Sequence, residues 1–490
     1  MTHVFLGMPA AGQGNLHASE PFPQAAHHEL GNTQLRANLR HATHTIRDKR
    51  LKVVGELPDW EELRDAGEAI KNFSMATLEQ RLEEFERNFT AAGGTIHWAR
   101  DAAEANEIVT ALIREQQVAE VVKVKSMATQ EIGLNEHLEA QGIDAYETDL
   151  AELIVQLGHD KPSHILVPAI HRNRTEVRDI FLREMPEVDP ELTDDPPRLA
   201  EAARRHLRKK FLTAKVAISG ANFALADTGT LGVVESEGNG RMCLTLPETL
   251  ITVMGIEKVL PSWRDLEVFM QLLPRSSTGE RMNPYSSLWT GVTPGDGPQN
   301  VHLILLDNGR TRALSDRVAR SALNCIRCSA CMNVCPVYER TGGHAYGSTY
   351  PGPIGAILSP LLTGIEAEEN NSLPYASSLC GACYEACPVK INIPEILVHL
   401  RAEDVDSRRG QARLPSQMDL LMKGGSWALG SGKHLGLLEK ALPLGQLAAG
   451  RRKKIKKLPG IAAGWTASRD IPAPPSKSFR DQWNAEKRSQ

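Results

Sequence analysis

Seven of the eight cysteines of this chain lie between residues 325 and 387, and this clustering constrains the fold more than any other feature. The first group, residues 325–336, reads Cys-Ile-Arg-Cys-Ser-Ala-Cys-Met-Asn-Val-Cys-Pro, which is the spacing C-x₂-C-x₂-C-x₃-C-P. Bacterial [4Fe–4S] ferredoxins use this spacing, in which three thiolates wrap a tight loop around one cluster and the fourth ligates another. Backbone N–H groups of such a loop can point at the sulfurs. The sequence therefore predicts a fold built around iron–sulfur clusters.

A second group, residues 380–388, reads Cys-Gly-Ala-Cys-Tyr-Glu-Ala-Cys-Pro and repeats the end of the first. In this alignment Ser377 stands where the first cysteine would be, so one ligand is missing. Crossed ligation predicts a complete site, cluster I, formed by Cys325, Cys328, Cys331 and Cys387. The incomplete site, cluster II, takes Cys335, Cys380 and Cys383, and its fourth position is empty or filled by Ser377, water or a partner. We expect [4Fe–4S] at cluster I and [4Fe–4S] or [3Fe–4S] at cluster II.

Other uses of these thiols fit the spacing less well. Structural zinc also uses C-x₂-C pairs, but it rarely needs three cysteines in x₂-x₂ succession followed by Cys-Pro. A dithiol redox site at Cys380 and Cys383 would call for a surrounding βαβ pattern, which is missing. The eighth thiol, Cys243, lies between Met242 and Leu244 and is expected to be a buried small hydrophobe.

Upstream of the cysteines, helical patterns alternate with short apolar runs typical of strands buried on both faces. The runs occupy residues 121–124, 165–167, 216–218, 251–254, 259–260 and 303–306. Helices are indicated by two apolar stripes, Leu78, Leu82, Phe85 and Phe89, then Ile108, Val109, Leu112 and Ile113. Asp149 with Glu152 three residues later marks the start of another helix. This alternation predicts an α/β unit with a mainly parallel sheet.

The chain has 490 residues, about three times the length of a typical domain, so we expect about three folded units. Residues 1–60 are expected to be an N-terminal helical extension with a surface helix from Asn32 to Arg50, followed by the α/β domain over 61–310. Residues 311–400 should form a helical two-cluster domain, because the segment between the cysteine groups is too long for a compact β-hairpin ferredoxin. Residues 401–490 form a basic, Gly- and Pro-rich tail of short helices joined by coil.

Charge and hydropathy limit the kinds of partner and the cellular location that we expect for this chain. The 56 Lys and Arg against 60 Asp and Glu argue against a protein whose surface is built for nucleic acid. No apolar run approaches the ~20 residues that cross a bilayer, and the N-terminus lacks signal-peptide features. We therefore expect a cytoplasmic protein. The basic run Arg451–Lys457 is expected to be a solvated linker, with docking on an anionic membrane or an acidic partner as the alternative.

Several stretches resemble the lactate-utilisation protein B family of iron–sulfur proteins, which carry a LUD domain. These stretches include both cysteine motifs and residues 123–127, 147–150, 162–164, 168–171, 226–230, 235–241, 342–347 and 465–472. The resemblance covers nearly the full length and implies a fold like the NagB/RpiA/CoA-transferase superfamily for residues 61–310. It also implies a role in oxidising L-lactate to pyruvate, as an electron carrier beside a dehydrogenase-type protein and a second LUD subunit. The second motif of the family also has three cysteines, so Ser377 does not weaken the match.

Several polar residues of the α/β part are candidates for ligand binding. Glycine lets backbone N–H groups approach an anion closely, so the candidate substrate-binding residues are Thr228, Thr230, Asn239 and Arg241. The simpler interpretation is that both glycine-containing segments are turns between strands. Structural roles are expected for His159, His164 and His171, which fit no compact metal motif, and a solvated pair of carboxylates is expected at Glu235 and Glu237.

Three functions remain open from the sequence. The first is electron transfer from a dehydrogenase complex through two clusters to an acceptor such as a quinone or cytochrome, with no catalytic residue in this chain. The second makes the LUD domain itself a substrate-binding catalytic oxidoreductase domain, with the clusters as its electron outlet. The third is a redox-sensing interaction protein in which cluster II senses oxidant.

Overall fold

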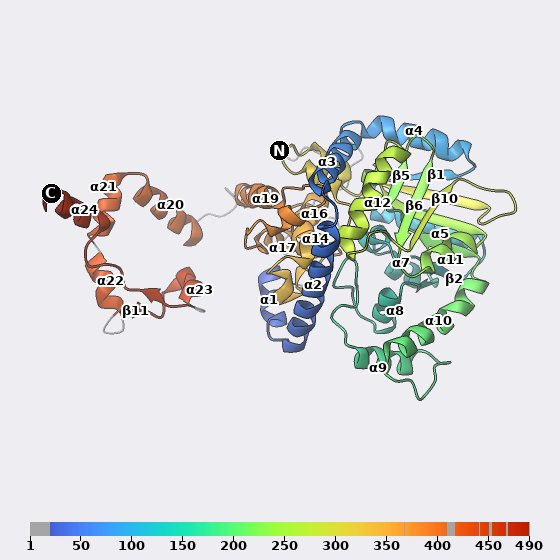
Figure 1. Ribbon diagram of the computed structural model, residues 1–490, viewed down its shortest axis with the longest axis horizontal. Coiled ribbons are helices and arrows are strands. Elements are labelled where there is room, and N and C mark those ends of the chain that lie inside the picture. The colour runs from blue at the N-terminus through green and yellow to red at the C-terminus, as the bar shows by residue number, and fades with distance from the viewer. Residues whose placement is uncertain are drawn as a thin grey trace. The chain divides into compact units, whose positions relative to one another are not determined.

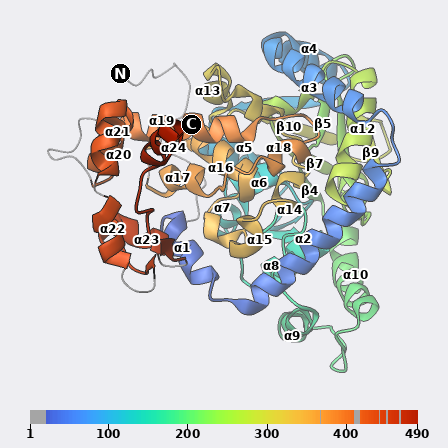
Figure 2. The ribbon, with the colours of Figure 1, turned by 60° about the vertical axis from the view of Figure 1, so that its left-hand side comes forward.

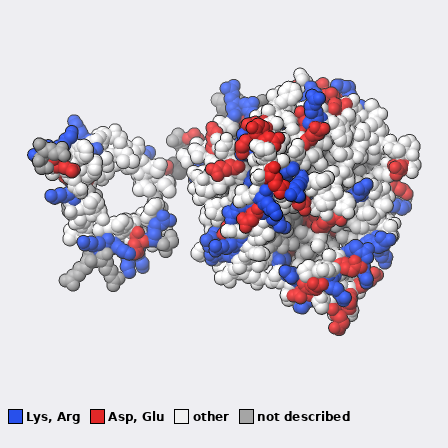
Figure 3. Space-filling model, viewed as in Figure 1, with Lys and Arg blue, Asp and Glu red and all other residues white. Residues whose placement is uncertain are grey.

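The structure is a computed structural model that describes residues 20–366, 368–408, 417–440, 442–449, 453–466 and 469–489. It divides into two units, residues up to Ser407 and residues from Arg408 onward. On the face of the first unit seen in Figure 3, acidic and basic residues are intermixed. Within the described ranges, no helix combines the length and the apolar character needed to span a bilayer.

A six-stranded parallel sheet forms the centre of the first unit (Figure 1). Its strands, in spatial order, are β1 (Thr95–Ala99), β10 (Asn300–Leu306), β7 (Thr249–Gly255), β4 (Val216–Ser219), β2 (Glu120–Lys123) and β3 (Asp144–Glu147). Every pairing in it is parallel. β4 and β7 are buried at every residue, as expected for strands covered on both faces.

A second sheet of four strands packs beside the first and is mostly antiparallel. In spatial order it contains β8 (Val259–Leu260), β5 (Phe223–Leu225), β6 (Thr230–Glu235) and β9 (Tyr285–Thr290). The predicted strand at residues 259–260 therefore exists, but it belongs to this smaller sheet and not to the parallel one.

Two helices of the α/β part, at residues 78–91 and 102–115, carry the predicted apolar stripes. The helices of this part are α4 (Leu78–Ala91), α5 (Ala102–Glu115), α6 (Met127–Glu131), α7 (Leu134–Ala140), α8 (Leu150–Leu157), α9 (Arg174–Glu184), α10 (Pro196–Thr213), α11 (Asn239–Thr245) and α12 (Trp263–Ser277). All four stripe residues of α4 are buried. The predicted start of α8 is confirmed, because the Asp149 carboxylate accepts hydrogen bonds from the backbone N–H groups of Ala151 and Glu152.

The predicted strand at residues 165–167 is wrong, because this segment is a loop. The ring nitrogen Nδ1 of His164 accepts hydrogen bonds from the backbone N–H groups of Leu166 and Val167, both at 3.0 Å. Ile165 is buried in the same apolar cluster as the cysteine motifs. A side-chain acceptor thus satisfies backbone groups that a neighbouring strand would otherwise bind, and the apolar run is buried without joining a sheet.

The cysteine motifs lie in a helical module, as predicted. Its elements are α13 (Arg310–Ser315), α14 (Ala330–Asn333), α15 (Tyr338–Thr341), α16 (Gly352–Thr363), α17 (Glu368–Ser372), α18 (Ala382–Ala386) and α19 (Ile393–Arg408), with short 3₁₀ turns between them. No strand occurs among the described residues between 311 and 400.

Three N-terminal helices, α1 (Phe22–Glu29), α2 (Thr33–Val54) and α3 (Trp60–Ala76), precede the α/β part. The helix predicted from Asn32 to Arg50 is α2, which is largely exposed and buries one face that includes Leu35, Leu39 and Arg50. It packs against α14 and α15, and Figure 2 shows it running beside them. The N-terminal extension is therefore part of the wall around the cysteines.

The second unit contains α20 (Gln417–Leu429), α21 (Gly432–Glu439), α22 (Leu442–Ala449), α23 (Ala463–Thr466) and α24 (Phe479–Ser489). A two-stranded antiparallel pair joins β11 (Lys454–Ile455) to β12 (Ile471–Pro472). Arg451 and Arg452 of the predicted basic run lie outside the described residues. The predicted fold class, an α/β region followed by a helical module and a helical tail, is confirmed; the domain boundaries at 60, 310 and 400 stay predictions.

Candidate iron–sulfur centres and an adjoining cavity

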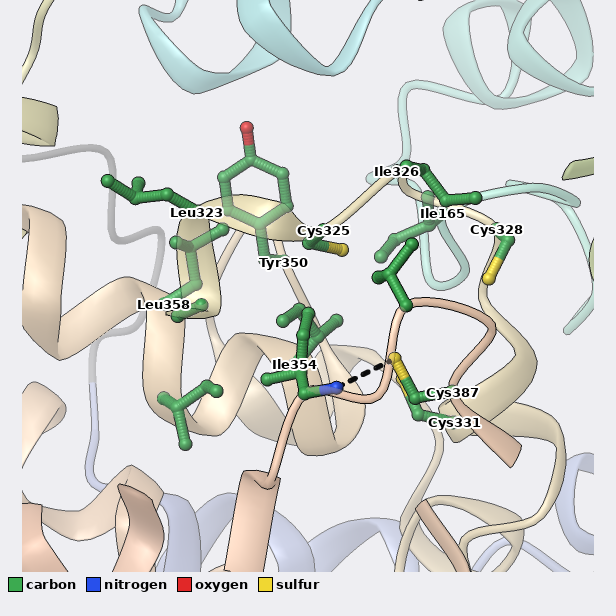
Figure 4. Packing of buried hydrophobic residues seen from close by; sticks show 14 of the residues in the cluster. Ile165, Leu323, Cys325, Ile326, Cys328, Cys331, Tyr350, Ile354, Leu358 and Cys387 are labelled. Atoms are coloured by element: carbon green, nitrogen blue, oxygen red, sulfur yellow. Dashed lines mark hydrogen bonds between the residues drawn. The ribbon is translucent and has the colours of Figure 1, made fainter. Parts of the chain in front are cut away.

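The seven clustered thiols fall into two groups within the helical module. Burial, then the sulfurs of Cys387 and Cys325, raise the pKa of Cys328 to about 12. Burial, then the sulfurs of Cys325, Cys328, Cys383 and Cys387, raise the pKa of Cys331. Figure 4 shows Cys325, Cys328, Cys331 and Cys387 in one region of the packed interior. These four residues are the ones predicted to hold cluster I, and their assignment to one cluster stays a prediction.

The second group contains the three cysteines predicted for cluster II. Burial, then the sulfurs of Cys335 and Cys380, raise the pKa of Cys383 to about 12. Cys335 and Cys383 are buried, whereas Cys380 is exposed. Ser377 accepts a hydrogen bond at Oγ from the backbone N–H of Leu379 at 3.1 Å, and its role as a fourth ligand stays a prediction.

The spacing of the thiols fits a cluster better than a single metal ion. A tetrahedral zinc site with Zn–S bonds near 2.3 Å brings its sulfurs to about 3.8 Å from one another. In the described part of the chain, two groups of three possible ligand atoms lie mutually within 4.8 Å, and neither contains a thiol. In the described part of the chain, no three thiols lie as close together as a single tetrahedral ion requires.

Backbone N–H groups point at the sulfurs, as the motif spacing predicts. The N–H groups of Arg327, Tyr338 and Ile391 donate to Sγ of Cys325, Cys335 and Cys387 at 3.4, 3.5 and 3.4 Å. Positive φ angles at Arg327 (62°), Ser329 (61°) and Gly381 (84°) turn the two loops inward. Buried soft donors with N–H groups directed at them are the surroundings that iron–sulfur clusters use, so the residues present fit the group.

Two arginines from the N-terminal helices fix the second cysteine motif. The Arg50 guanidinium donates to the carbonyl oxygen of Ala386 at 3.0 Å. The Arg64 guanidinium donates to the carbonyl oxygens of Cys387 at 3.0 Å and Tyr384 at 3.2 Å. Both arginine side chains are buried. Sequence analysis missed this role, because nothing in the local sequence of α2 or α3 indicates contacts more than 300 residues away.

A loop of the α/β part fixes the first cysteine motif. His164 Nε2 lies 3.2 Å from the side-chain oxygen of Asn333, and the Tyr338 hydroxyl donates to the carbonyl oxygen of Ser163 at 2.8 Å. Burial lowers the pKa of His164 to about 4, so the ring is neutral at neutral pH. The structural role predicted for this histidine agrees with both of its ring nitrogens being bonded.

A cavity of about 360 Å³ adjoins the first motif. Its floor is formed by residues that follow three neighbouring strands: Lys125 after β2, Gly220–Asn222 after β4, and Glu257 with Lys258 after β7. Arg327 and Tyr350 of the helical module close the opposite side. Carboxyl ends of parallel strands are the usual ligand-binding edge of an α/β sheet.

A buried ionic network forms one wall of this cavity. The Arg310 guanidinium pairs with both oxygens of Glu131, at 2.8 and 2.9 Å, and also with Glu257. Arg327 donates to the other Glu257 oxygen at 3.2 Å and lies over the Tyr350 ring, 4.7 Å from its centroid. Burial tends to raise the pKa of Glu257, but Arg310 and Arg327 outweigh it and hold the pKa at about 2. Glu257 is therefore ionised throughout the physiological range.

The predicted substrate-binding residues are not gathered in one place. Asn239 lines the cavity and donates to the Thr148 hydroxyl at 3.3 Å, whereas Arg241 is exposed. Thr228 and Thr230 form a chain of hydroxyl hydrogen bonds with Thr290 at the edge of the small sheet. Neither threonine lines the cavity. A substrate-binding role for the four residues stays a prediction.

The glycine-containing turn at residues 238–240 binds a carboxylate of this chain, that of Glu235. Gly238 has φ of 85° and begins α11, so the turn is not a hairpin between strands. The Glu235 carboxylate accepts hydrogen bonds from the N–H groups of Gly238, Gly240 and Arg241 at 3.0, 3.0 and 2.7 Å. The expectation that Glu235 is a solvated carboxylate is therefore wrong.

Two further sequence expectations are settled by contacts. Cys243 is fully buried and burial raises its pKa to about 12, which confirms it as a small hydrophobe of the core. His171 is bonded through both ring nitrogens, to Ser163 at 2.7 Å and Asp160 at 2.8 Å. Its ligand atoms also lie within 4.8 Å of those of Asp160 and His344.

Comparisons with known proteins match both parts of the chain. Residues 82–306 match the LUD domain, and residues 321–391 match the 4Fe-4S dicluster domain. Lactate utilization protein B of Bacillus subtilis (strain 168) is 42% identical over 96% of this chain and 97% of that protein. Lactate utilization protein B 1 of Bacillus mycoides is 41% identical, over 94% and 95% of the two chains. Lactate utilization protein B of an Exiguobacterium species is 43% identical, over 91% and 93%.

Proposed function

The chain belongs to the lactate utilization protein B family, and on that premise we propose that it carries electrons in the oxidation of L-lactate to pyruvate. In this proposal it receives electrons from a dehydrogenase-type partner and passes them through two iron–sulfur clusters. The partners are the other lactate-utilisation proteins, including a second LUD subunit, and an acceptor such as a quinone or cytochrome.

The observation that carries the proposal is the arrangement of the thiols. Four of them are buried together in the packed interior, and the remaining three include the exposed Cys380. An iron–sulfur cluster supplies one-electron transfer when bound. A buried group next to a surface group gives an inner site shielded from water and an outer site that a partner protein can approach.

The chain's own residues hold and insulate these sites. Cys325, Cys328, Cys331 and Cys387 would hold cluster I, and Cys335, Cys380 and Cys383 would hold cluster II. The N–H groups of the cysteine loops donate to sulfur, which stabilises negative charge on the thiolates. Arg50 and Arg64 keep the second loop in place. No residue of this chain is assigned the abstraction of hydride from lactate.

Anaerobic reconstitution followed by iron and sulfide analysis and low-temperature EPR tests the proposal. We expect Cys325→Ser to remove one EPR signal and Cys383→Ser to remove the other. Cys243→Ser is the matched control, because this thiol is buried outside both groups, and it should keep both signals. Colourless protein that holds zinc in place of iron would overturn the assignment.

A second measurement tests the direction of electron flow. With L-lactate and the dehydrogenase-type partner, the clusters of this chain should become reduced; without the partner they should stay oxidised. Sustained formation of pyruvate by the purified chain alone, with an artificial acceptor, would instead make the LUD domain the catalytic domain.

A further inference from the structure

The cavity beside the first cysteine motif has the position of a ligand site. The cavity lies at the carboxyl ends of three neighbouring strands of the parallel sheet, β7, β4 and β2. Arg327 and Tyr350 of the helical module also line it, so a bound molecule would contact both the α/β part and the cluster I loop. Its volume of about 360 Å³ falls within the range of small-molecule sites.

One end of the cavity carries more positive than negative charge. Glu257 is surrounded by the side chains of Lys71, Lys258, Arg310 and Arg327. Among the described residues, the other anionic groups near them are Glu131, which is paired with Arg310, and the sulfur of Cys325. Burial lowers the pKa of Lys258 to about 7, and an anion beside it would favour its charged form. Lys71 donates to the backbone oxygen of Glu257. In the described part of the chain, the Lys258 ammonium forms neither a hydrogen bond nor an ion pair, although it lines the cavity. Buried charges are normally paired, so an anionic group is favoured here.

The rest of the cavity offers hydrogen-bond acceptors and apolar surface. The side-chain oxygen of Asn283 is buried and has no hydrogen-bond partner, and Asn283 lines the cavity and is 7% exposed. Carboxylates of Asp149 and Glu237 lie elsewhere on the wall. Apolar side chains complete it: Val124, Met127, Val167, Val233, Met254 and Leu273. Such a wall suits a ligand that has a hydroxyl group and carbon atoms as well as a negative charge, and an inorganic anion has no carbon atoms to pack on the apolar part.

We propose that this cavity binds a small hydroxycarboxylic acid, with the carboxylate on Lys258 and Arg327 and the hydroxyl donating to Asn283. The choice of L-lactate as the probe rests on the proposed function, whereas the chemical class follows from the cavity. Occupation of the site would place the acid against the loop that contains Cys325. The inference concerns binding and assigns no chemical step to the α/β domain.

Isothermal titration of the cluster-loaded full chain with L-lactate, propionate and inorganic phosphate tests the proposal. L-lactate should bind more tightly than propionate, which lacks the hydroxyl group, and more tightly than phosphate. Lys258→Met should weaken L-lactate binding at least tenfold, and Lys258→Arg should restore most of it. Lys52→Met, at an exposed lysine of α2, should leave binding unchanged. Asn283→Ala should weaken L-lactate and leave propionate unaffected, because only the hydroxyl contact is removed.

Several outcomes would overturn the proposal. No binding of L-lactate, equal binding of phosphate, or equal loss of lactate and propionate in Asn283→Ala would each do so. A Lys258→Met protein that binds lactate normally, but whose cluster I has a changed reduction potential, would show that the cations serve the cluster alone. Circular dichroism and the two EPR signals of each variant establish that folding is intact.

The experiments distinguish an error in the cavity assignment from an error in the proposed electron-carrier function. If lactate does not bind but the dehydrogenase-type partner still reduces the clusters, the cavity assignment is wrong and the proposed function stands. If lactate binds and the partner does not reduce the clusters, the proposed function is wrong and the cavity assignment stands.

Discussion

Arg310 is 2% exposed and holds two buried carboxylates, so its removal should be one of the most destabilising single changes in the first unit. Arg310→Met leaves Glu131 and Glu257 buried without their main partner, which costs about 3–5 kcal/mol. Arg281 is the matched control: it pairs bidentately with Glu56 in the same way, but its side chain is 71% exposed. Arg281→Met should cost at most about 1 kcal/mol. Urea denaturation followed by circular dichroism measures both, and equal losses would contradict the role of burial.

Glu152 is a single residue that makes the free energy of unfolding depend on pH. Burial, then the nearby Glu147, raise its pKa from the ordinary 4.5 to about 7. A raised carboxyl pKa contributes stability that is complete below the unfolded-state value and is lost as pH rises through 7. The two values differ by an amount that corresponds to roughly 3 kcal/mol as an upper bound.

Glu152→Gln should therefore be neutral near pH 4 and more stable than the parent chain at pH 8. Glutamine keeps the acceptor for the Gln130 amide, which lies 2.7 Å from Glu152. Denaturation midpoints between pH 4 and 8 measure the difference, with the exposed Glu83→Gln as the control. A difference that stays constant across this range would show that Glu152 ionises normally.

At the same scale, the limits of sequence analysis can be traced to particular residues. The thiols were predicted because the ligand spacing is local and nearly all of it lies within two short motifs. Arg64, Lys258 and Asn283 were not predicted. Each is brought by the tertiary fold to groups that are distant in the sequence, and the local sequence does not show these neighbours. The role of Glu235 could not be predicted, because the hydrogen bonds from residues 238–241 to its carboxylate form only when the turn leads into a helix.

At the scale of elements, α9 and α10 differ in how their first turns are satisfied. Asn173 caps α9 through a capping box with Glu176, whereas Asp195 precedes α10 without a side-chain cap bond. Asn173→Ala should cost about 1 kcal/mol, and Asp195→Ala only a few tenths. Hydrogen exchange of the amides of α9 and α10 reports the local change. Equal effects at the two positions would contradict a contribution from the cap.

The same elements explain which parts of the fold were predictable. Four strands of the parallel sheet, β2, β4, β7 and β10, followed from apolar runs, and α4 followed from its 3.6-residue period. The edge strands β1 and β3 were not predicted, because they are only partly buried and lack an apolar run. The loop at residues 165–167 has the same apolar composition as a strand, and only the ring of His164, which satisfies its backbone, distinguishes it. The packing of α2 on the cysteine module was invisible for a related reason, because its buried face includes Arg50 and Thr43.

At the scale of the whole molecule, the cysteine module and the α/β part are one unit and not two joined by a linker. The hydrogen bonds of His164 and Tyr338 cross from one part to the other, and those of Arg50 and Arg64 join the N-terminal helices to the cysteine module. Sequence analysis divided the chain at residue 310, where the strand pattern ends, because motif boundaries carry no information about such contacts. The clusters should therefore depend on the N-terminal helices more than on the tail.

This dependence leads to a prediction for truncated and substituted chains. A chain that ends at Ser407 lacks the second unit and should keep its iron content and both EPR signals, because every thiol and every anchoring residue lies before that point. Arg64→Met in the full chain should lower the cluster I signal, since it frees the carbonyl groups of Tyr384 and Cys387. The control is Arg81→Met on α4, whose guanidinium pairs with Glu84 and should not affect iron. Loss of cluster I from the truncated chain, with Arg64→Met unaffected, would reverse the order of dependence and make the tail part of the cluster environment.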